Sequence, residues 1–112
     1  MEKTATRKRT RPEESPKAEH ARQLRRQAGR WLGAQREHAG LTQAQVAERV
    51  GLRYYTFVSQ VEGGHGRVPS EHFKSWAQAI GVPTHEFAKT LLKYYEPDIF
   101  PLLFPDEADA AE

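Results

Sequence analysis

A short helix with capping residues at both ends is predicted near the middle of the chain. Thr42 is a favourable N-cap, and Gln45 three residues later completes the pattern of a capping box. Its apolar positions are Val46, Ala47 and Val50. Gly51 follows directly and suits the left-handed conformation that ends many helices. The chain must therefore turn sharply at Gly51, so the residues that follow belong to a separate element that runs in a different direction.

The same capping and spacing signals predict helices on either side of this one. A first helix is expected to begin at Ser15-Pro16 and to end at Ala39-Gly40, although Gly29 and Gly33 weaken it. The remaining predicted helices run from near Arg53–Tyr55 to Glu62, from Pro69-Ser70 to Gly81, and from Pro83-Thr84 to Glu96-Pro97. No strand pattern is present, so the predicted fold class is all-α with five helices, followed by an apolar C-terminal extension.

The apolar side chains of these helices define a candidate core. Phe57, Val58 and Val61 form the expected buried face of the third helix. The large aromatic residues expected in the core are Trp31, Phe73, Trp76 and Phe87. Arg36 and Glu37 could equally pair with each other on an exposed helix face.

Charge is distributed unevenly along the 112 residues. Residues 1–30 contain ten Lys or Arg and four Glu, whereas residues 96–112 contain six acids and no base. A basic segment is attracted to phosphates; the alternative is that both ends are simply solvated. The chain has no Cys and no apolar run long enough to span a membrane, and its basic N-terminus lacks the apolar part of a secretory signal. These features favour a cytoplasmic protein.

The expected organisation has four parts. Residues 1–14 are predicted to be a disordered basic arm, and residues 15–95 to form the helical domain. Residues 96–105 form an apolar segment, and residues 106–112 an acidic tail.

The stretch from Gly40 to Gly51, read GLTQAQVAERVG, resembles the first half of the lambda-repressor-like, or Xre-type, helix-turn-helix family. Val58-Ser59-Gln60-Val61-Glu62, Gly64 and Pro69-Ser70 resemble the second half, and the resemblance covers about Trp31 to Phe87. It implies a lambda-repressor-like DNA-binding domain whose third helix enters the major groove of DNA.

The resemblance also implies a set of DNA-contacting residues. Gln43, at the start of the second helix, and Arg67, in the glycine-rich loop, are the phosphate candidates. Candidates on or near the third helix are Arg53, Tyr54, Tyr55, Thr56, Ser59 and Gln60. The turn before Val58 has one residue more than the family pattern, so individual base contacts at positions 53–56 do not transfer directly. The alternative for Tyr54 and Tyr55 is that one of them packs in the core.

The C-terminal part has more apolar residues than a five-helix core requires. We expect a two-fold homodimer through Leu91, Tyr94, Tyr95, Phe100, Leu103 and Phe104. The alternative is that this segment folds back over its own core.

These observations predict a transcription regulator, most simply a repressor, that binds a palindromic site on double-stranded DNA and associates with the nucleoid. The alternatives are an antitoxin-type DNA-binding protein with a protein partner, and a nonspecific nucleoid-type protein. No catalytic constellation stands out, so no enzyme activity, metal or cofactor is expected.

Overall fold

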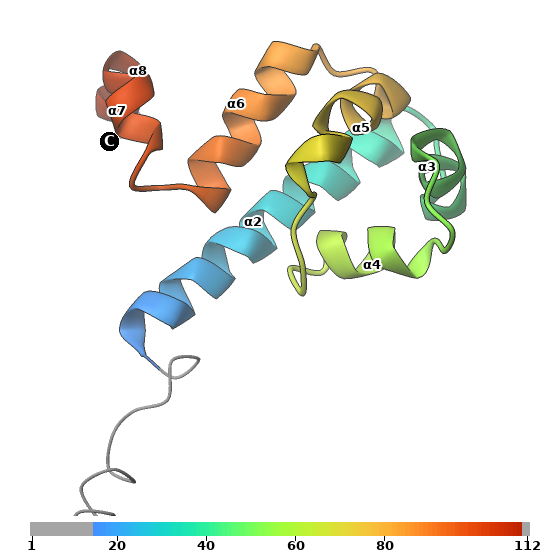
Figure 1. The fold of residues 1–112 in the computed structure, drawn as a ribbon, viewed down its shortest axis with the longest axis horizontal. Coiled ribbons are helices and arrows are strands. Elements are labelled where there is room, and N and C mark those ends of the chain that lie inside the picture. The colour runs from blue at the N-terminus through green and yellow to red at the C-terminus, as the bar shows by residue number, and fades with distance from the viewer. Residues whose placement is uncertain (1–14, 111–112) are drawn as a thin grey trace, which may run out of the picture.

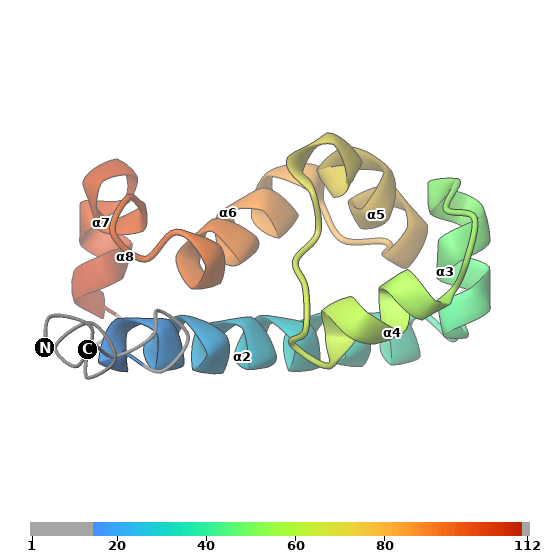
Figure 2. The same cartoon turned by 60° about the horizontal axis from the view of Figure 1, so that its bottom comes forward.

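One long helix, α2 (Pro16–His38), extends along the molecule and supports the other elements (Figures 1 and 2). The computed structural model describes residues 15–110, so the predicted basic arm at residues 1–14 lies outside the described residues. The side chain of Ser15 caps α2 by accepting a hydrogen bond from the backbone N–H of Ala18 at 3.0 Å. Pro16 occupies the first turn, where its missing N–H has no cost. Both predicted ends of this helix are confirmed.

The helix predicted at the centre of the chain is α3 (Gln43–Val50). Both hydrogen bonds of the capping box are present: Gln45 N–H donates to the Thr42 hydroxyl at 3.1 Å, and Thr42 N–H donates to Oε1 of Gln45 at 2.8 Å. Gly51 adopts φ +92°, a left-handed conformation that a residue with a Cβ rarely takes. The local sequence thus determines both ends of α3.

The next helix, α4 (Thr56–Glu62), starts later than the sequence predicted. It begins directly after the range Arg53–Tyr55 near which it was expected, with Tyr55 as its N-cap, and residues 51–55 form the turn between α3 and α4. Val58 and Val61 are fully buried, as expected, whereas Phe57 is only partly buried against the edge of Trp76.

The remaining main helices are α5 (Phe73–Ile80) and α6 (Thr84–Tyr95). The predicted fourth helix was continuous from Ser70, but its first turn is the separate 3₁₀ helix η2 (Ser70–His72). Helix α2 packs against α4 and α6, while α3 packs against α4 and α5. Every regular element of residues 15–110 is helical, so the all-α fold class is confirmed.

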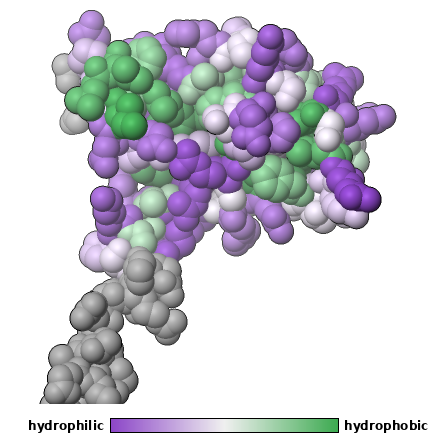
Figure 3. All heavy atoms as spheres, in the orientation of Figure 1, coloured by the Kyte–Doolittle hydropathy of each residue, from purple (hydrophilic) through white to green (hydrophobic). Residues whose placement is uncertain are grey.

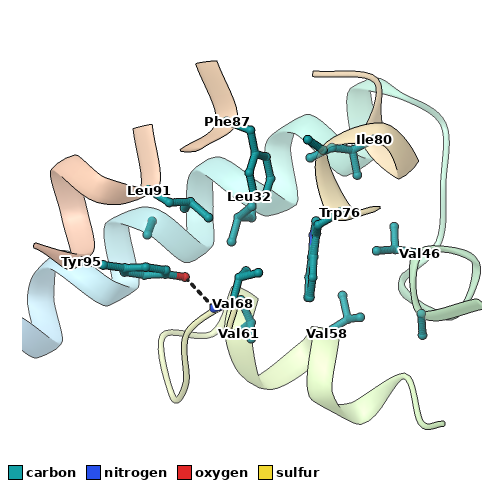
Figure 4. Packing of buried hydrophobic residues seen from close by; sticks show 13 residues of the cluster. Leu32, Val46, Val58, Val61, Val68, Trp76, Ile80, Phe87, Leu91 and Tyr95 are labelled. Carbon is teal, nitrogen blue, oxygen red and sulfur yellow. Dashed lines mark hydrogen bonds between the residues drawn. The ribbon is translucent and has the colours of Figure 1, made fainter. Parts of the chain in front are cut away.

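The core lies where these helices meet (Figure 4). Trp76 and Phe87 are buried, as predicted. Trp31 and Phe73 are only partly buried, and each ring lies against Phe87, with centroid distances of 5.9 and 5.7 Å. The other large, fully buried side chains are Leu32, Val46, Val58, Val61, Val68 and Leu91.

The C-terminal extension forms the short helices α7 (Phe100–Leu103) and α8 (Pro105–Ala110), which the sequence did not predict. Phe100 is buried, and Phe104 lies against it at a centroid distance of 5.2 Å. Lys89 of α6 reaches the extension by an ion pair with Glu107 at 2.5 Å and lies over the ring of Phe104. The extension therefore folds back onto the helical domain.

The residues expected at a dimer interface divide into two groups. Leu91, Tyr95 and Phe100 are buried within the protomer, and Tyr94 and Phe104 are partly buried. Leu103 is exposed, together with Ile99 and Leu102. We call Ile99, Leu102 and Leu103 the α7 patch; Figure 3 shows an apolar cluster in this region of the surface.

Candidate nucleic-acid interface

Helix α4 has one buried side and one polar exposed side. Val58 and Val61 face the core with no exposed surface, while Thr56, Ser59 and Gln60 are exposed. Within residues 15–110, no hydrogen bond occupies the side chains of these three polar residues. Their donors and acceptors are therefore available to an external partner.

The turn before α4 extends this exposed surface. Tyr54 and Tyr55 are 65% and 54% exposed, so neither packs in the core and that alternative is wrong. Arg53 is also exposed, with its guanidinium 5.8 Å from the centre of the Tyr54 ring. All six candidate residues between positions 53 and 60 are thus on the surface, with Arg53, Tyr54 and Tyr55 in the turn rather than on the helix.

The C-terminal end of α4 is held against α2 by an ion pair. Arg36 donates to Glu62 from Nε at 2.7 Å and from Nη2 at 3.1 Å, and its Nη1 donates to the carbonyl oxygen of Leu41 at 2.8 Å. The side chains of Arg36 and Glu62 are only 13% and 10% exposed. The hydrogen bond to Glu62 is the main cause of a raised pKa for Arg36. Glu37, which the sequence offered as a partner, is 3.7 Å from Arg36 and largely solvated.

Two glycines in α2 allow α4 to approach closely. A Cβ on Gly29 would lie 2.6 Å from the carbonyl carbon of Glu62 and 2.7 Å from the carbonyl oxygen of Val61. A Cβ on Gly33 would lie 3.1 Å from Oε1 of Glu62. The glycines that weaken α2 as an isolated helix are therefore the contact point for the end of α4.

Gln43 also forms a hydrogen bond with the Arg36–Glu62 ion pair. Its Nε2 donates to Oε1 of Glu62 at 3.0 Å, and the residue is half-buried at the start of α3. Glu62 consequently links α2, α3 and α4. Gln43 lies close to the α4 end but its amide already has a partner within the protein.

The loop after α4 is held at two points. Gly64 has φ +83° and lies against Arg26, where a Cβ would come within 2.8 Å of the Arg26 Cα. Val68 N–H donates to the hydroxyl of Tyr95 at 3.1 Å (Figure 4). Burial is the main cause of a raised pKa for Tyr95.

Arg67 contacts α6 rather than standing free in solvent. Its guanidinium lies 4.5 Å from the centre of the Tyr95 ring, and Nη2 donates to Glu96 at 3.1 Å. The side chain remains 48% exposed. The candidate phosphate contact at Arg67 thus lies beyond the C-terminal end of α4, with its charge partly compensated.

Sequence reasoning missed the residues that position α4, chiefly Arg36, Glu62 and Gly29. The glycine pair four residues apart in α2 was the one signal that could have indicated a close helix contact. No local pattern links Arg36 to Glu62, because they are 26 positions apart.

No protein-family model matches the chain, and no curated protein matches it. Among residues 15–110, no helix is long and apolar enough to cross a membrane, and no group of three His, Asp or Glu could hold a metal ion.

Proposed function

We propose that this protein is a sequence-specific regulator of transcription that binds duplex DNA with α4 in the major groove. The observation that carries the proposal is the division of α4 into a buried apolar side and an exposed polar side without hydrogen-bond partners. We further propose that α3 and α4 form a lambda-repressor-like helix-turn-helix. Repression by blocking access to a promoter is the simplest mode of action.

The dimensions of α4 suit this role. A helix of seven residues is about 10 Å long at 1.5 Å per residue. The major groove is about 12 Å wide and admits an α-helix, so α4 can enter it. The anchored C-terminal end of α4 supports the proposal because a reading helix must present its side chains in a fixed orientation.

The exposed side chains have the chemistry needed to read base pairs. Gln60 can bond adenine through two atoms, and Arg53 can bond guanine in the same way. Ser59 and Thr56 can donate to bases or phosphates, and the two exposed tyrosines can contact phosphate or a thymine methyl group. Gln43 and Arg67, both near the C-terminal end of α4, are proposed to contact phosphates.

The test is selection of bound duplexes from a random pool, followed by affinity measurements on the selected site. A specific regulator should prefer that site over random duplex by on the order of 10³ or more. Gln60→Ala should weaken binding to the selected site by about 1–3 kcal/mol and change binding to random duplex little. Gln78→Ala on α5 is the matched control, because Gln78 is exposed and lies outside the proposed interface.

Failure to enrich any site, with similar affinity for all duplexes, would instead support a nonspecific nucleoid-type protein. Equal losses for Gln60→Ala on selected and random duplexes would remove Gln60 from base reading.

We propose a homodimer through the α7 patch, in place of the buried residues Leu91, Tyr95 and Phe100. Leu102 is 78% exposed and the neighbouring Leu103 and Ile99 are also exposed, an unusual concentration of apolar surface for so short a segment. Two-fold pairing would place two α4 helices on a palindromic site.

The same patch supports the second candidate, an antitoxin-type protein. In that case a toxin-like protein would cover the α7 patch while α4 binds DNA. Co-purification of one stoichiometric small partner would favour this candidate, and a purified homodimer without a partner would favour the first. In either case we propose a cytoplasmic, nucleoid-associated protein.

A further inference from the structure

Arginines lie along the side of α2 that also contacts α4. Arg22, Arg26, Gly29 and Gly33 are separated by steps of four, three and four residues, so they form one stripe along the helix. The end of α4 meets this stripe at Gly29 and Gly33, and the following loop meets it where Gly64 lies against Arg26. These contacts place the arginines on the α4 side of α2.

The arginine part of the stripe extends beyond α4. Figures 1 and 2 show the N-terminal half of α2 continuing past the end of α4 and past the loop that follows it. The segment from Arg22 to Arg30 is about 12 Å long at 1.5 Å per residue. A helix centred in the major groove, which is about 12 Å wide, lies about 6 Å from each bordering backbone, so a segment of this length is long enough to reach that backbone.

The charge of this segment is positive and accessible. The side chains of Arg22 and Arg26 are 32% and 45% exposed, and Arg30 is exposed. One acid accompanies them: Glu19 pairs with Arg22 at 2.5 Å and lies 3.6 Å from Arg26. Both arginines lower the pKa of Glu19, Arg22 most strongly, so this carboxylate stays charged and offsets only part of the three positive charges.

The other end of the same side of α2 has a different charge balance. A shallow groove between α2 and the end of α4 is lined by Arg30 and Arg36 but also by Glu37 and Glu62. Arg36 is compensated by Glu62. The uncompensated positive charge is therefore confined to residues 22–30, next to the loop that follows α4.

We propose that Arg22, Arg26 and Arg30 form a second surface for duplex DNA that contacts the phosphate backbone bordering the groove occupied by α4. This inference rests on the proposed function, since it requires α4 to bind duplex DNA. The surface contributes affinity rather than sequence preference, because phosphates are the same at every base pair. Its position would also fix the direction in which the duplex crosses the protein.

The experiment measures the salt dependence of binding to a mixed-sequence duplex of about 30 base pairs, from 50 to 200 mM salt, with the full chain. Arg26→Gln/Arg30→Gln should reduce the slope of log K against log salt by about 1.8, since each lost phosphate contact removes about 0.9. Over this fourfold range of salt, the affinity of the parent protein should fall by a factor about 12 times larger than the affinity of the variant does.

Two control variants test whether the slope depends on the position of the arginines rather than on the net charge or the folding of the protein. Lys17→Gln/Lys93→Gln removes the same charge on the α6 side, where these lysines line hollows with Tyr95 and Trp31 respectively, and should keep the parent slope. Arg26→Lys/Arg30→Lys retains the charge and should also keep it.

The outcomes are distinct. An unchanged slope in Arg26→Gln/Arg30→Gln, or an equal reduction in the lysine control, would overturn this inference while leaving α4 as the DNA-reading element. Absence of any duplex binding by the parent protein would overturn the proposed function, and this inference with it.

Discussion

The guanidinium of Arg36 and the carboxylate of Glu62 form a two-bond ion pair, at 2.7 and 3.1 Å, that fastens the end of α4 to α2. Glu62 also accepts a hydrogen bond from Gln43 at the start of α3. The pair is nearly enclosed, with side-chain exposures of 13% and 10%. One carboxylate thus sets the relative positions of three helices.

Loss of Arg36 is expected to be strongly destabilising. Arg36→Met should lower the free energy of unfolding by about 3 kcal/mol, because Glu62 is left as a nearly buried charge without its main partner. Urea denaturation measures this change. Arg22→Met is the control, because its pair with Glu19 is solvated and should contribute little to stability.

A double variant tests whether the isolated charge of Glu62 causes this loss of stability. Arg36→Met/Glu62→Leu should recover much of the lost stability, since it removes the isolated charge. Equal losses for Arg36→Met and Arg22→Met would show that burial of the ion pair is unimportant.

Gly29→Ala should destabilise the protein, although helix propensity alone predicts that it would be stabilising. Alanine in a helix interior is favoured over glycine by about 1 kcal/mol. A Cβ at Gly29 would nevertheless collide with backbone atoms of Val61 and Glu62, so Gly29→Ala should destabilise the protein by about 1–3 kcal/mol.

Gly33→Ala is the matched comparison, and thermal denaturation of both variants measures the two changes in stability. Its Cβ would meet the end of the Glu62 side chain at 3.1 Å, which can adjust more easily than backbone. We expect a smaller change than at Gly29. A stabilised Gly29→Ala protein would contradict the close approach of α4 to α2.

Tyr95→Phe should destabilise the protein in a pH-dependent way. Without the hydroxyl, the buried N–H of Val68 loses its acceptor, at a cost of about 1–3 kcal/mol. Burial raises the pKa of Tyr95 above the 10.0 of a free side chain, so the folded protein holds the proton more tightly than the unfolded chain. The stabilisation is therefore complete below about pH 10 and is lost as pH rises through the folded pKa.

Urea denaturation at several pH values between 8 and 11 tests the direction in which this stabilisation changes with pH. The stability difference between the parent protein and Tyr95→Phe should be largest below pH 10 and shrink above it. Tyr94→Phe is the control at neutral pH, because within residues 15–110 its hydroxyl has no hydrogen-bond partner, and its loss should be small. A difference that grows with alkaline pH would refute the assignment to Tyr95.

Charges introduced in the α7 patch should prevent dimer formation without unfolding the protomer. Leu102→Asp/Leu103→Asp places two charges at exposed positions, where a partner copy would have to bury them. Sedimentation at tens of micromolar should then show a monomer, with an unchanged circular dichroism spectrum. Gln27→Asp/Ala34→Asp on the exposed side of α2 should remain dimeric, whereas a monomeric parent protein would contradict the homodimer.

Much of the helical architecture was predictable because helix ends depend on neighbouring residues. The contacts at Ser15 and Thr42 join residues three positions apart, and Gly51 requires only its own backbone freedom. The start of α4 was less predictable. Tyr55 precedes it with no side-chain cap, so nothing in the sequence marks the boundary.

Helical spacing predicts the two sides of α4, since Val58 and Val61 define the buried side and leave Ser59 and Gln60 outside. The sequence by itself therefore determined the five main helical segments and which side of α4 is polar. Only the tertiary structure decided that Arg36 pairs with Glu62, that Gly29 is a contact point, and that Tyr95 is buried while Leu102 is exposed. The physical reason is that capping and periodicity act within a few residues, whereas these contacts depend on how helices far apart in the sequence pack together.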